Sequence, residues 1–282
     1  MQRWKIGDVT ITKVLELEIS GSMTWILPDA TPESLARIPW LKPHFVDEQG
    51  DPTVSVHALV VESEGQRILV DTCIGNDKKR PIPGWDLRQG PFLQDLAAAG
   101  HPADSIDTVL CTHLHVDHVG WNTRLEKGRW VPTFESARYL WNRDEYDYWA
   151  AHPEEQMGDV MGDSVQPVLD AGRVDFVAPD HVVTSEVRLE PTPGHTPGHV
   201  SVRVHSCGEE AVITGDLMHH PVQCAHPEWA ASVDYDPEQA RGTRRAFLEG
   251  CADRPVIVLG THFAGPTGGR IVRDGDVFRL DA

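Results

Sequence analysis

The chain has 282 residues, of which 40% are hydrophobic and 24% are charged, and its formal net charge is −18. No apolar run approaches the roughly 20 residues that cross a bilayer, so we expect no membrane span. The strong negative charge, with no basic tract to offset it, argues against nucleic acid as a partner.

Residues 8–19, 54–61 and 67–71 have the alternating, β-branched pattern of strands and predict an opening antiparallel sheet. The N-terminal residues are polar and contain no apolar stretch typical of a signal peptide, which favours a cytoplasmic location. The five cysteines are odd in number, scattered and without a CxxC pair. They predict neither a disulfide framework nor a thiolate metal site.

Between the strands predicted at 8–19 and 54–61, residues 20–50 form a predicted N-terminal arm that is rich in proline and aromatic residues, with a short helix at 32–37. Its apolar side chains are consistent with two roles that the sequence leaves open. They suit a flap over a hydrophobic substrate, or they pack on the body of the protein or form a homodimer contact.

The rest of the chain alternates between predicted strands and helices. Helices are expected at 89–99, 143–150 and 237–251, and short strands at 108–112, 174–177, 187–190, 200–204, 211–214 and 255–259. Strands gathered in both halves, with helices between them, predict an α+β fold in which two sheets form a sandwich with helices outside. Without a linker or repeat, we expect one domain over residues 1–282.

A dense group of metal-ligand side chains follows the predicted strand at 108–112. The segment reads His113-x-His115-x-Asp117-His118, and imidazole with carboxylate is the ligand set that zinc prefers. His113 and His115 share one side of an extended segment and can reach one ion. Asp117 and His118, on the turn that follows, can reach a second.

Three further donors lie downstream, each at the end of a predicted strand: His195, Asp216 and His262. A carboxylate such as Asp216 can bridge two cations. The seven donors then divide into His113, His115 and His195 for one ion, and Asp117, His118 and His262 for the other. We expect two divalent ions, with zinc favoured and iron, manganese or cobalt as alternatives.

Other histidines stand close to these donors. His199, four residues after His195, fits a residue that orients a ligand better than a ligand itself. His219 and His220 follow Asp216 and are candidates for contact with substrate, with plain loop histidines as the alternative.

The HxHxDH motif, followed in order by His, Asp and His, resembles the metallo-β-lactamase fold superfamily over about residues 53–265. The resemblance implies a four-layer αββα sandwich and an enzyme. The Asp117-His118 pair and Asp216 resemble the dinuclear hydrolase branch of that superfamily. The arm and the segment Thr261-His262-Phe263 are most similar to its lactonase and methyl parathion hydrolase-like group.

We therefore expect a metal-dependent hydrolase in which a metal-bridging hydroxide cleaves an ester or lactone bond of a small-molecule substrate. Asp117, a ligand with one free oxygen, is the candidate catalytic proton carrier. Organophosphate (phosphotriester) and thioester hydrolysis stay open, because the same ions serve them. Further alternatives are a β-lactamase and a non-catalytic metal-binding protein of the same fold.

Overall fold

The computed structural model describes residues 2–21, 23–153 and 155–282. Its strands are β1 (Arg3–Ile6), β2 (Val9–Ser20), β3 (Thr53–Ser63), β4 (Gln66–Val70), β5 (Thr108–Leu110), β6 (Thr123–Glu126), β7 (Arg129–Pro132), β8 (Arg138–Asn142), β9 (Val174–Val177), β10 (Val187–Pro191), β11 (Val200–Ser206), β12 (Glu209–Ile213), β13 (Val256–Leu259), β14 (Gly268–Asp274) and β15 (Val277–Asp281). Its α-helices are α1 (Pro32–Leu35), α2 (Phe92–Ala98), α3 (Arg143–Ala151), α4 (Gln166–Asp170), α5 (Val222–Ala225) and α6 (Pro237–Cys251). Helical segments of the 3-10 type are η1 (Pro39–Leu41), η2 (Ala103–Ser105), η3 (Gly120–Asn122), η4 (Glu155–Met157) and η6 (Gly215–Leu217), and η5 (Met161–Val165) is a π-helix.

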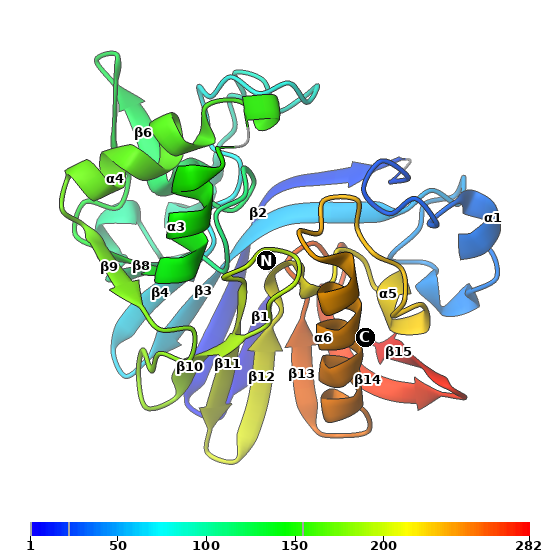
Figure 1. Cartoon of the computed structure of the whole chain (residues 1–282). Coiled ribbons are helices and arrows are strands. Elements are labelled where there is room, and N and C mark those ends of the chain that lie inside the picture. Colours follow the sequence, from blue (N-terminus) through cyan, green and yellow to red (C-terminus); the bar gives the residue numbers. More distant parts are fainter. Residues whose placement is uncertain (1, 22, 154) are drawn as a thin grey trace.

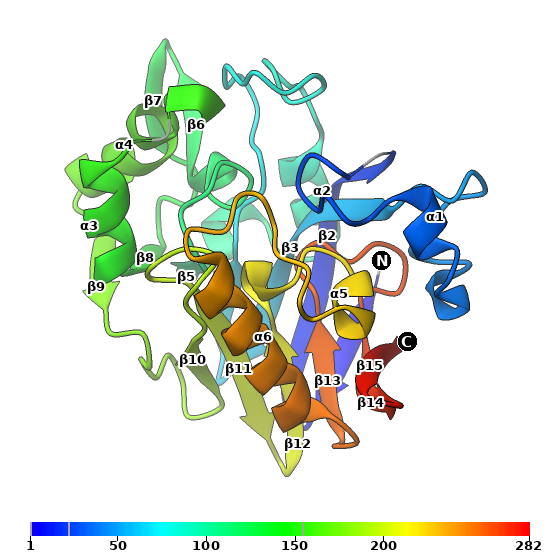
Figure 2. The same cartoon turned by 45° about the vertical axis from the view of Figure 1, so that its right-hand side comes forward.

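The strands form two mixed sheets and a small hairpin. The first sheet has the order β1-β2-β3-β4-β5-β8-β9, the second has the order β10-β11-β12-β13-β14-β15, and β6 pairs with β7. Helices α3 and α4 lie next to β8 and β9, and α6 lies beside β13 and packs on β14 (Figure 1). Turning the molecule shows α5 and α6 together on the outer side of the second sheet (Figure 2). The predicted αββα sandwich is confirmed.

Three apolar cores hold the layers together. Side chains such as Ile11, Leu59 and Val202 fill the space between the two sheets. A second core joins the first sheet to its helices, and a third joins the second sheet to α6 and to the N-terminal arm. None of the helices in the described ranges is long and apolar enough to cross a membrane. All five cysteines are free thiols, as predicted.

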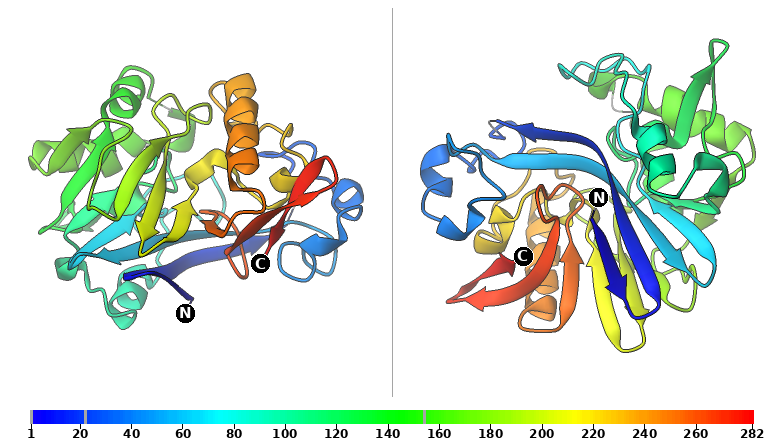
Figure 3. Two further views of the ribbon diagram at one scale, coloured as in Figure 1. Left: turned by 90° about the horizontal axis from the view of Figure 1, so that it is seen from below. Right: turned by 180° about the vertical axis from the view of Figure 1, so that it is seen from behind.

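The arm at residues 20–50 is part of this third core. Leu27 and Leu41 are fully buried and Phe45 is 1% exposed, and they share a cluster with Met218 and Phe263. Strands β2 and β3 extend beyond the rest of their sheet towards α1. This extension places the arm alongside the second sheet (Figure 3). These side chains therefore pack on the body of the protein. The homodimer contact stays a prediction.

The fold brings several strand ends to one edge of the sandwich. β4 and β5 are parallel, and so are β12 and β13, while β10 is antiparallel to β11 and therefore runs in the direction of β12. Loops that follow the carboxyl ends of parallel strands meet at the same edge, where ligands commonly bind. The candidate donors follow β5 in the first sheet and β10, β12 and β13 in the second, so strand direction brings the donors of the second sheet to one edge.

If the arm is part of the core, shortening its most buried aromatic ring must cost stability. We expect Phe45→Ala to lower the free energy of unfolding by about 3–5 kcal/mol, because it opens a cavity that its neighbours cannot fill. Urea denaturation measures this loss. Trp25→Ala, at a site 56% exposed, is the control and is expected to change stability by less than about 0.5 kcal/mol. Equal effects of the two variants would contradict the packing of the arm.

Candidate metal centre

The first group of donors consists of His113, His115 and His195. His115 Nδ1 lies 3.1 Å from His113 Nε2 and 2.9 Å from His195 Nε2, so three ring nitrogens converge on one point. His113 and His115 come from the loop after β5, and His195 from the loop after β10. His113 is fully buried and His195 is 2% exposed, while His115 is partly exposed.

The second group consists of Asp117, His118 and His262. His118 Nε2 and His262 Nε2 are 3.3 Å apart. Asp117 Oδ1 lies 3.7 Å from His118 Nε2, and Asp117 Oδ2 lies 3.6 Å from His262 Nε2. This arrangement joins the turn after β5 to the loop after β13. The sequence predicts this group, which is one of four that the described donor atoms form.

Asp216 lies between the two groups. Its Oδ2 atom is 3.8 Å from His113 Nε2 and 3.5 Å from His195 Nε2. Its Oδ1 atom is 3.3 Å from His118 Nε2 and 3.2 Å from His262 Nε2. Each oxygen thus faces one group, which is the geometry that a bridging carboxylate requires.

Contacts on the far side of the rings determine which nitrogens carry protons. The Nδ1 atoms of His118, His195 and His262 lie 3.0 Å from Asp71 Oδ2, Asp234 Oδ1 and the Ser55 carbonyl oxygen, respectively. These partners only accept hydrogen bonds, so each Nδ1 is the donor. In the neutral rings, each Nε2 therefore presents a lone pair to the centre.

These lone pairs are the observation that tests the site for a cation. In the first group, a single proton on His115 Nδ1 can satisfy only one of the two Nε2 atoms that face it. In addition, Asp216 Oδ1 is buried without a hydrogen bond among the described residues. Converging lone pairs and a buried carboxylate are costly unless a positive charge lies among them. The donors, all imidazole and carboxylate, fit divalent ions such as zinc.

The pKa values of these groups follow from burial and from Asp216. Burial lowers the pKa of His113, His115 and His195 well below the ordinary value, which keeps these rings neutral. Burial also lowers the pKa of His262, but the Asp216 carboxylate outweighs it and raises that pKa to about 8. A cation that binds here must displace that proton.

The three remaining candidate histidines have different surroundings. His199 Nε2 accepts a hydrogen bond of 2.9 Å from the Asp216 backbone N–H. The backbone approaches this ring so closely that a Cβ on Gly215, whose φ is +55°, would lie 2.6 Å from His199 Nε2. His199 therefore holds the backbone of Asp216 in place.

His219 and His220 point to different places. His219 is 2% exposed, its Nε2 lies 3.4 Å from Asp216 Oδ2, and neither ring nitrogen has a hydrogen bond among the described residues. Both nitrogens of His220 are occupied, because Nε2 donates to the Phe45 carbonyl oxygen and Nδ1 accepts from the Val222 N–H. The expectation of substrate contact therefore does not hold for His220, which ties the arm to the second sheet.

Two carboxylates that orient the rings were not expected from the sequence. Asp71 follows β4 directly and adopts a φ of +58°. Besides His118, it accepts hydrogen bonds from the backbone and hydroxyl of Thr112. Asp216 was identified by its place at a strand end, and the same signal could have identified Asp71. Asp234 lies in a loop 39 residues from His195, and nothing in the local sequence marks it.

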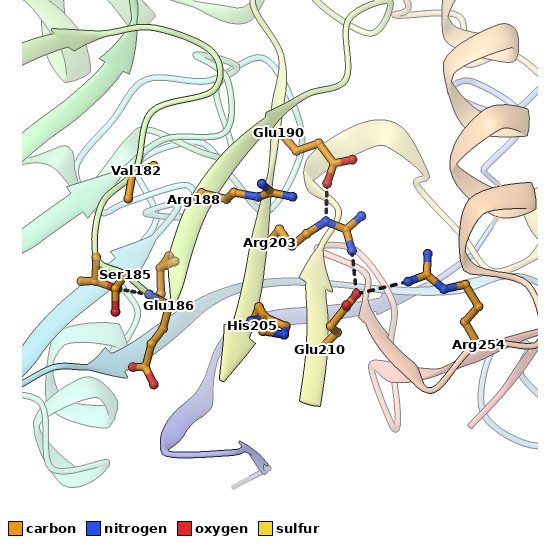
Figure 4. Close-up of a pocket in the computed structure, with 11 residues that line it drawn as sticks. Val182, Ser185, Glu186, Arg188, Glu190, Arg203, His205, Glu210 and Arg254 are labelled. Carbon is orange, nitrogen blue, oxygen red and sulfur yellow. Dashed lines mark hydrogen bonds and ion pairs between the residues drawn. The ribbon is translucent and has the colours of Figure 1, made fainter. Parts of the chain in front are cut away.

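A surface groove of about 610 Å³ lies far from this chemistry, on the outer face of β10, β11 and β12 (Figure 4). Its charged side chains neutralise one another: Arg203 pairs with Glu190 at 2.6 Å and with Glu210 at 3.4 Å. None of the seven candidate donors lines it. The buried cluster of imidazoles is therefore the candidate site.

Comparison with known proteins agrees with this geometry. The family model described as the metallo-beta-lactamase superfamily matches residues 51–275. The N-acyl homoserine lactonase AiiA of Bacillus thuringiensis subsp. kurstaki is 29% identical over 221 residues, which cover 73% of this chain and 80% of the relative.

Two solved structures superpose over nearly the whole chain. One is AidC, described as a dizinc quorum-quenching lactonase, with a TM-score of 0.80 and 24% identity, covering 99% of this chain and 96% of its own. The other is the hydrolase AbOPH of the beta lactamase superfamily, with a TM-score of 0.80 and 25% identity, covering 99% and 95%.

The contact between Asp71 and His118 gives a test of the tautomer argument. In Asp71→Asn the amide nitrogen can donate to His118 Nδ1, which moves the ring proton to Nε2 and removes a lone pair from the centre. We expect the affinity for one of two ions to fall by about 10–100-fold, measured by chelator competition. Asp104→Asn, at an exposed position, is the control. Unchanged affinity for both ions in Asp71→Asn would contradict the assigned tautomer.

Proposed function

Since the chain belongs to the metallo-beta-lactamase superfamily, we propose that it is a metal-dependent hydrolase that opens the ester bond of a lactone with two divalent ions. The observation that carries this proposal is the pair of donor groups that share the carboxylate of Asp216. A structural metal site closes its coordination with protein ligands. Two adjacent three-residue groups with a common carboxylate leave room for solvent and substrate.

We propose the following assignment of the donors. One ion is held by His113, His115 and His195, the other by Asp117, His118 and His262, and Asp216 bridges them. Zinc is the proposed metal, because the donors are nitrogen and oxygen atoms and because the structural neighbour AidC is described as a dizinc enzyme. When bound, such ions supply an activated water and polarise a carbonyl group.

The chain's own residues provide the remaining chemistry. Asp216 stays ionised, since burial raises its pKa but His118, His262 and His219 lower it well below the ordinary value. Asp117 is partly exposed, and its Oδ1 faces His118 while its Oδ2 faces His262. An oxygen of Asp117 that holds no ion can take up a proton from water. His219 is the one buried imidazole of the described centre with both nitrogens free of hydrogen bonds, and it can donate Nε2–H to a substrate oxygen.

The substrate class follows from the relatives. AiiA is named an N-acyl homoserine lactonase, and AidC is described with a ring-opened N-acyl homoserine product. We therefore propose an N-acyl lactone, a small uncharged ester that a buried centre with a carboxylate at its middle can accept. A cytoplasmic location and a homodimer through the arm are proposed with it and rest on the sequence patterns.

A substrate panel on the zinc-loaded protein tests this function. We expect two ions per chain by elemental analysis. N-acyl homoserine lactones should be hydrolysed with a higher kcat/KM than aryl esters, phosphotriesters, thioesters or β-lactams. Removal of the ions by a chelator should abolish turnover, and zinc should restore it. A chain that binds no metal after reconstitution, or that prefers a phosphotriester to every lactone, would refute the proposal.

Substitution of His219 tests its contact with substrate. His219→Phe keeps a ring of similar shape and removes the donor, so we expect kcat to fall by about 100-fold, with two ions still bound. His219→Gln, which restores an N–H donor, should recover at least part of this loss. The control is His205→Phe, at an exposed histidine on the outer face of β11. Loss of an ion from His219→Phe would instead identify His219 as a ligand.

A further inference from the structure

The N-terminal end of α3 contacts both loops that supply the first group of donors. Glu145, in the first turn of this helix, is 1% exposed. Its Oε1 atom accepts a hydrogen bond of 3.0 Å from the backbone N–H of Leu114, which lies between His113 and His115. Its Oε2 atom accepts one of 3.0 Å from the N–H of Gly198, three residues after His195.

The same end of α3 also contacts the carbonyl group of Gly198. The side chain of Asn142, the N-cap residue of α3, donates a hydrogen bond of 2.8 Å to the Gly198 carbonyl oxygen. A Cβ atom on Gly198 would lie 2.5 Å from the Glu145 backbone nitrogen. The loop can approach the helix this closely because residue 198 has no side chain.

The chemistry of this contact requires a carboxylate. Besides the two backbone groups, Trp149 Nε1 donates to Glu145 Oε1 at 2.7 Å, and the Trp149 ring packs edge-on against His115 at a centroid distance of 5.0 Å. All three partners of Glu145 are donors, and an ionised carboxylate is acceptor-only. Burial raises the pKa of Glu145, and the Thr196 hydroxyl together with the three donors offsets part of that cost.

We propose that Glu145 is a positioning residue that joins the His113–His115 loop to the His195–Gly198 loop and thereby sets the affinity for the first ion. This inference rests on the two-ion site of the proposed function and assigns a role to a side chain that touches neither ion nor substrate. The loops belong to different sheets, and their relative position determines whether His195 Nε2 reaches the point shared by His113 and His115. Glu145 bonds the backbone of both.

The second ion has separate supports. His118 is oriented by Asp71, and His262 is oriented by the Ser55 carbonyl oxygen, which lies on β3. Neither of these contacts involves α3. A change at Glu145 should therefore weaken one ion and leave the other.

Glu145→Gln is the sharpest variant, because it keeps the shape and replaces one acceptor oxygen by an NH₂ group that faces a donor. We expect the affinity for one ion to fall by about 10–100-fold, so that the zinc content after dialysis against a chelator falls from two ions per chain to one. Asp144→Asn, the same type of change on the neighbouring exposed residue, is the control and should keep two.

Combination with Asp71→Asn identifies which ion is lost. If Glu145 acts on the first ion and Asp71 on the second, the double variant should lose both ions under conditions in which each single variant keeps one. Retention of one ion by the double variant would overturn the assignment, as would wild-type affinity for both ions in Glu145→Gln. The titration needs no substrate, so absence of the proposed lactonase activity would not change its outcome.

A second variant guards against misfolding of Glu145→Gln. Gly198→Ala leaves the carboxylate in place and forces the loop away from α3. We expect the same selective loss of one ion, with a circular dichroism spectrum like that of the wild type. A folded Gly198→Ala protein that binds two ions with wild-type affinity would refute the positioning role.

Discussion

The structure depends on one electrostatic constraint: imidazole Nε2 atoms from several loops converge on a single buried carboxylate, Asp216. His118 Nε2 and His262 Nε2 approach each other to 3.3 Å because both face Asp216 Oδ1. Such a cluster is costly in the folded chain when it lacks a cation. Much of the surrounding structure holds the cluster in place. An ion that binds only to the folded chain stabilises it and offsets that cost.

The supports of the cluster share a design in which buried acceptors face the outer ring nitrogens. Asp71 and Asp234 act in this way on His118 and His195, one for each proposed ion. The cost is visible in the backbone: Asp71 and, two residues later, Cys73 adopt positive φ values of 58° and 52°. Strain of this kind persists where surrounding structure over-determines it, and here both residues lie beneath the loop that carries His113 to His118.

The ligands could be predicted because the information is local, and the supports could not because theirs is not. The sequence shows a hydrophobic strand followed by His or Asp at β5, β12 and β13. Glu145 and Asp234 act on residues 31 and 39 positions away. Strand β14, which the sequence did not predict, starts with Gly268 and Gly269, a residue type that weakens strands. They are glycines because a Cβ would lie 2.3 Å from Leu259 Cδ2 and 2.4 Å from the Asp281 carbonyl oxygen, respectively.

The same network connects the arm to the centre. The Ser232 N–H donates to the Ile26 carbonyl oxygen, and the Tyr235 N–H donates to that of His195, so one loop spans from the arm to a ligand. Between these two residues lies Asp234, which orients His195. The exposed rings of Trp25 and Tyr235 sit at the two ends of this loop. The arm is therefore joined to His195 through backbone hydrogen bonds of a single loop.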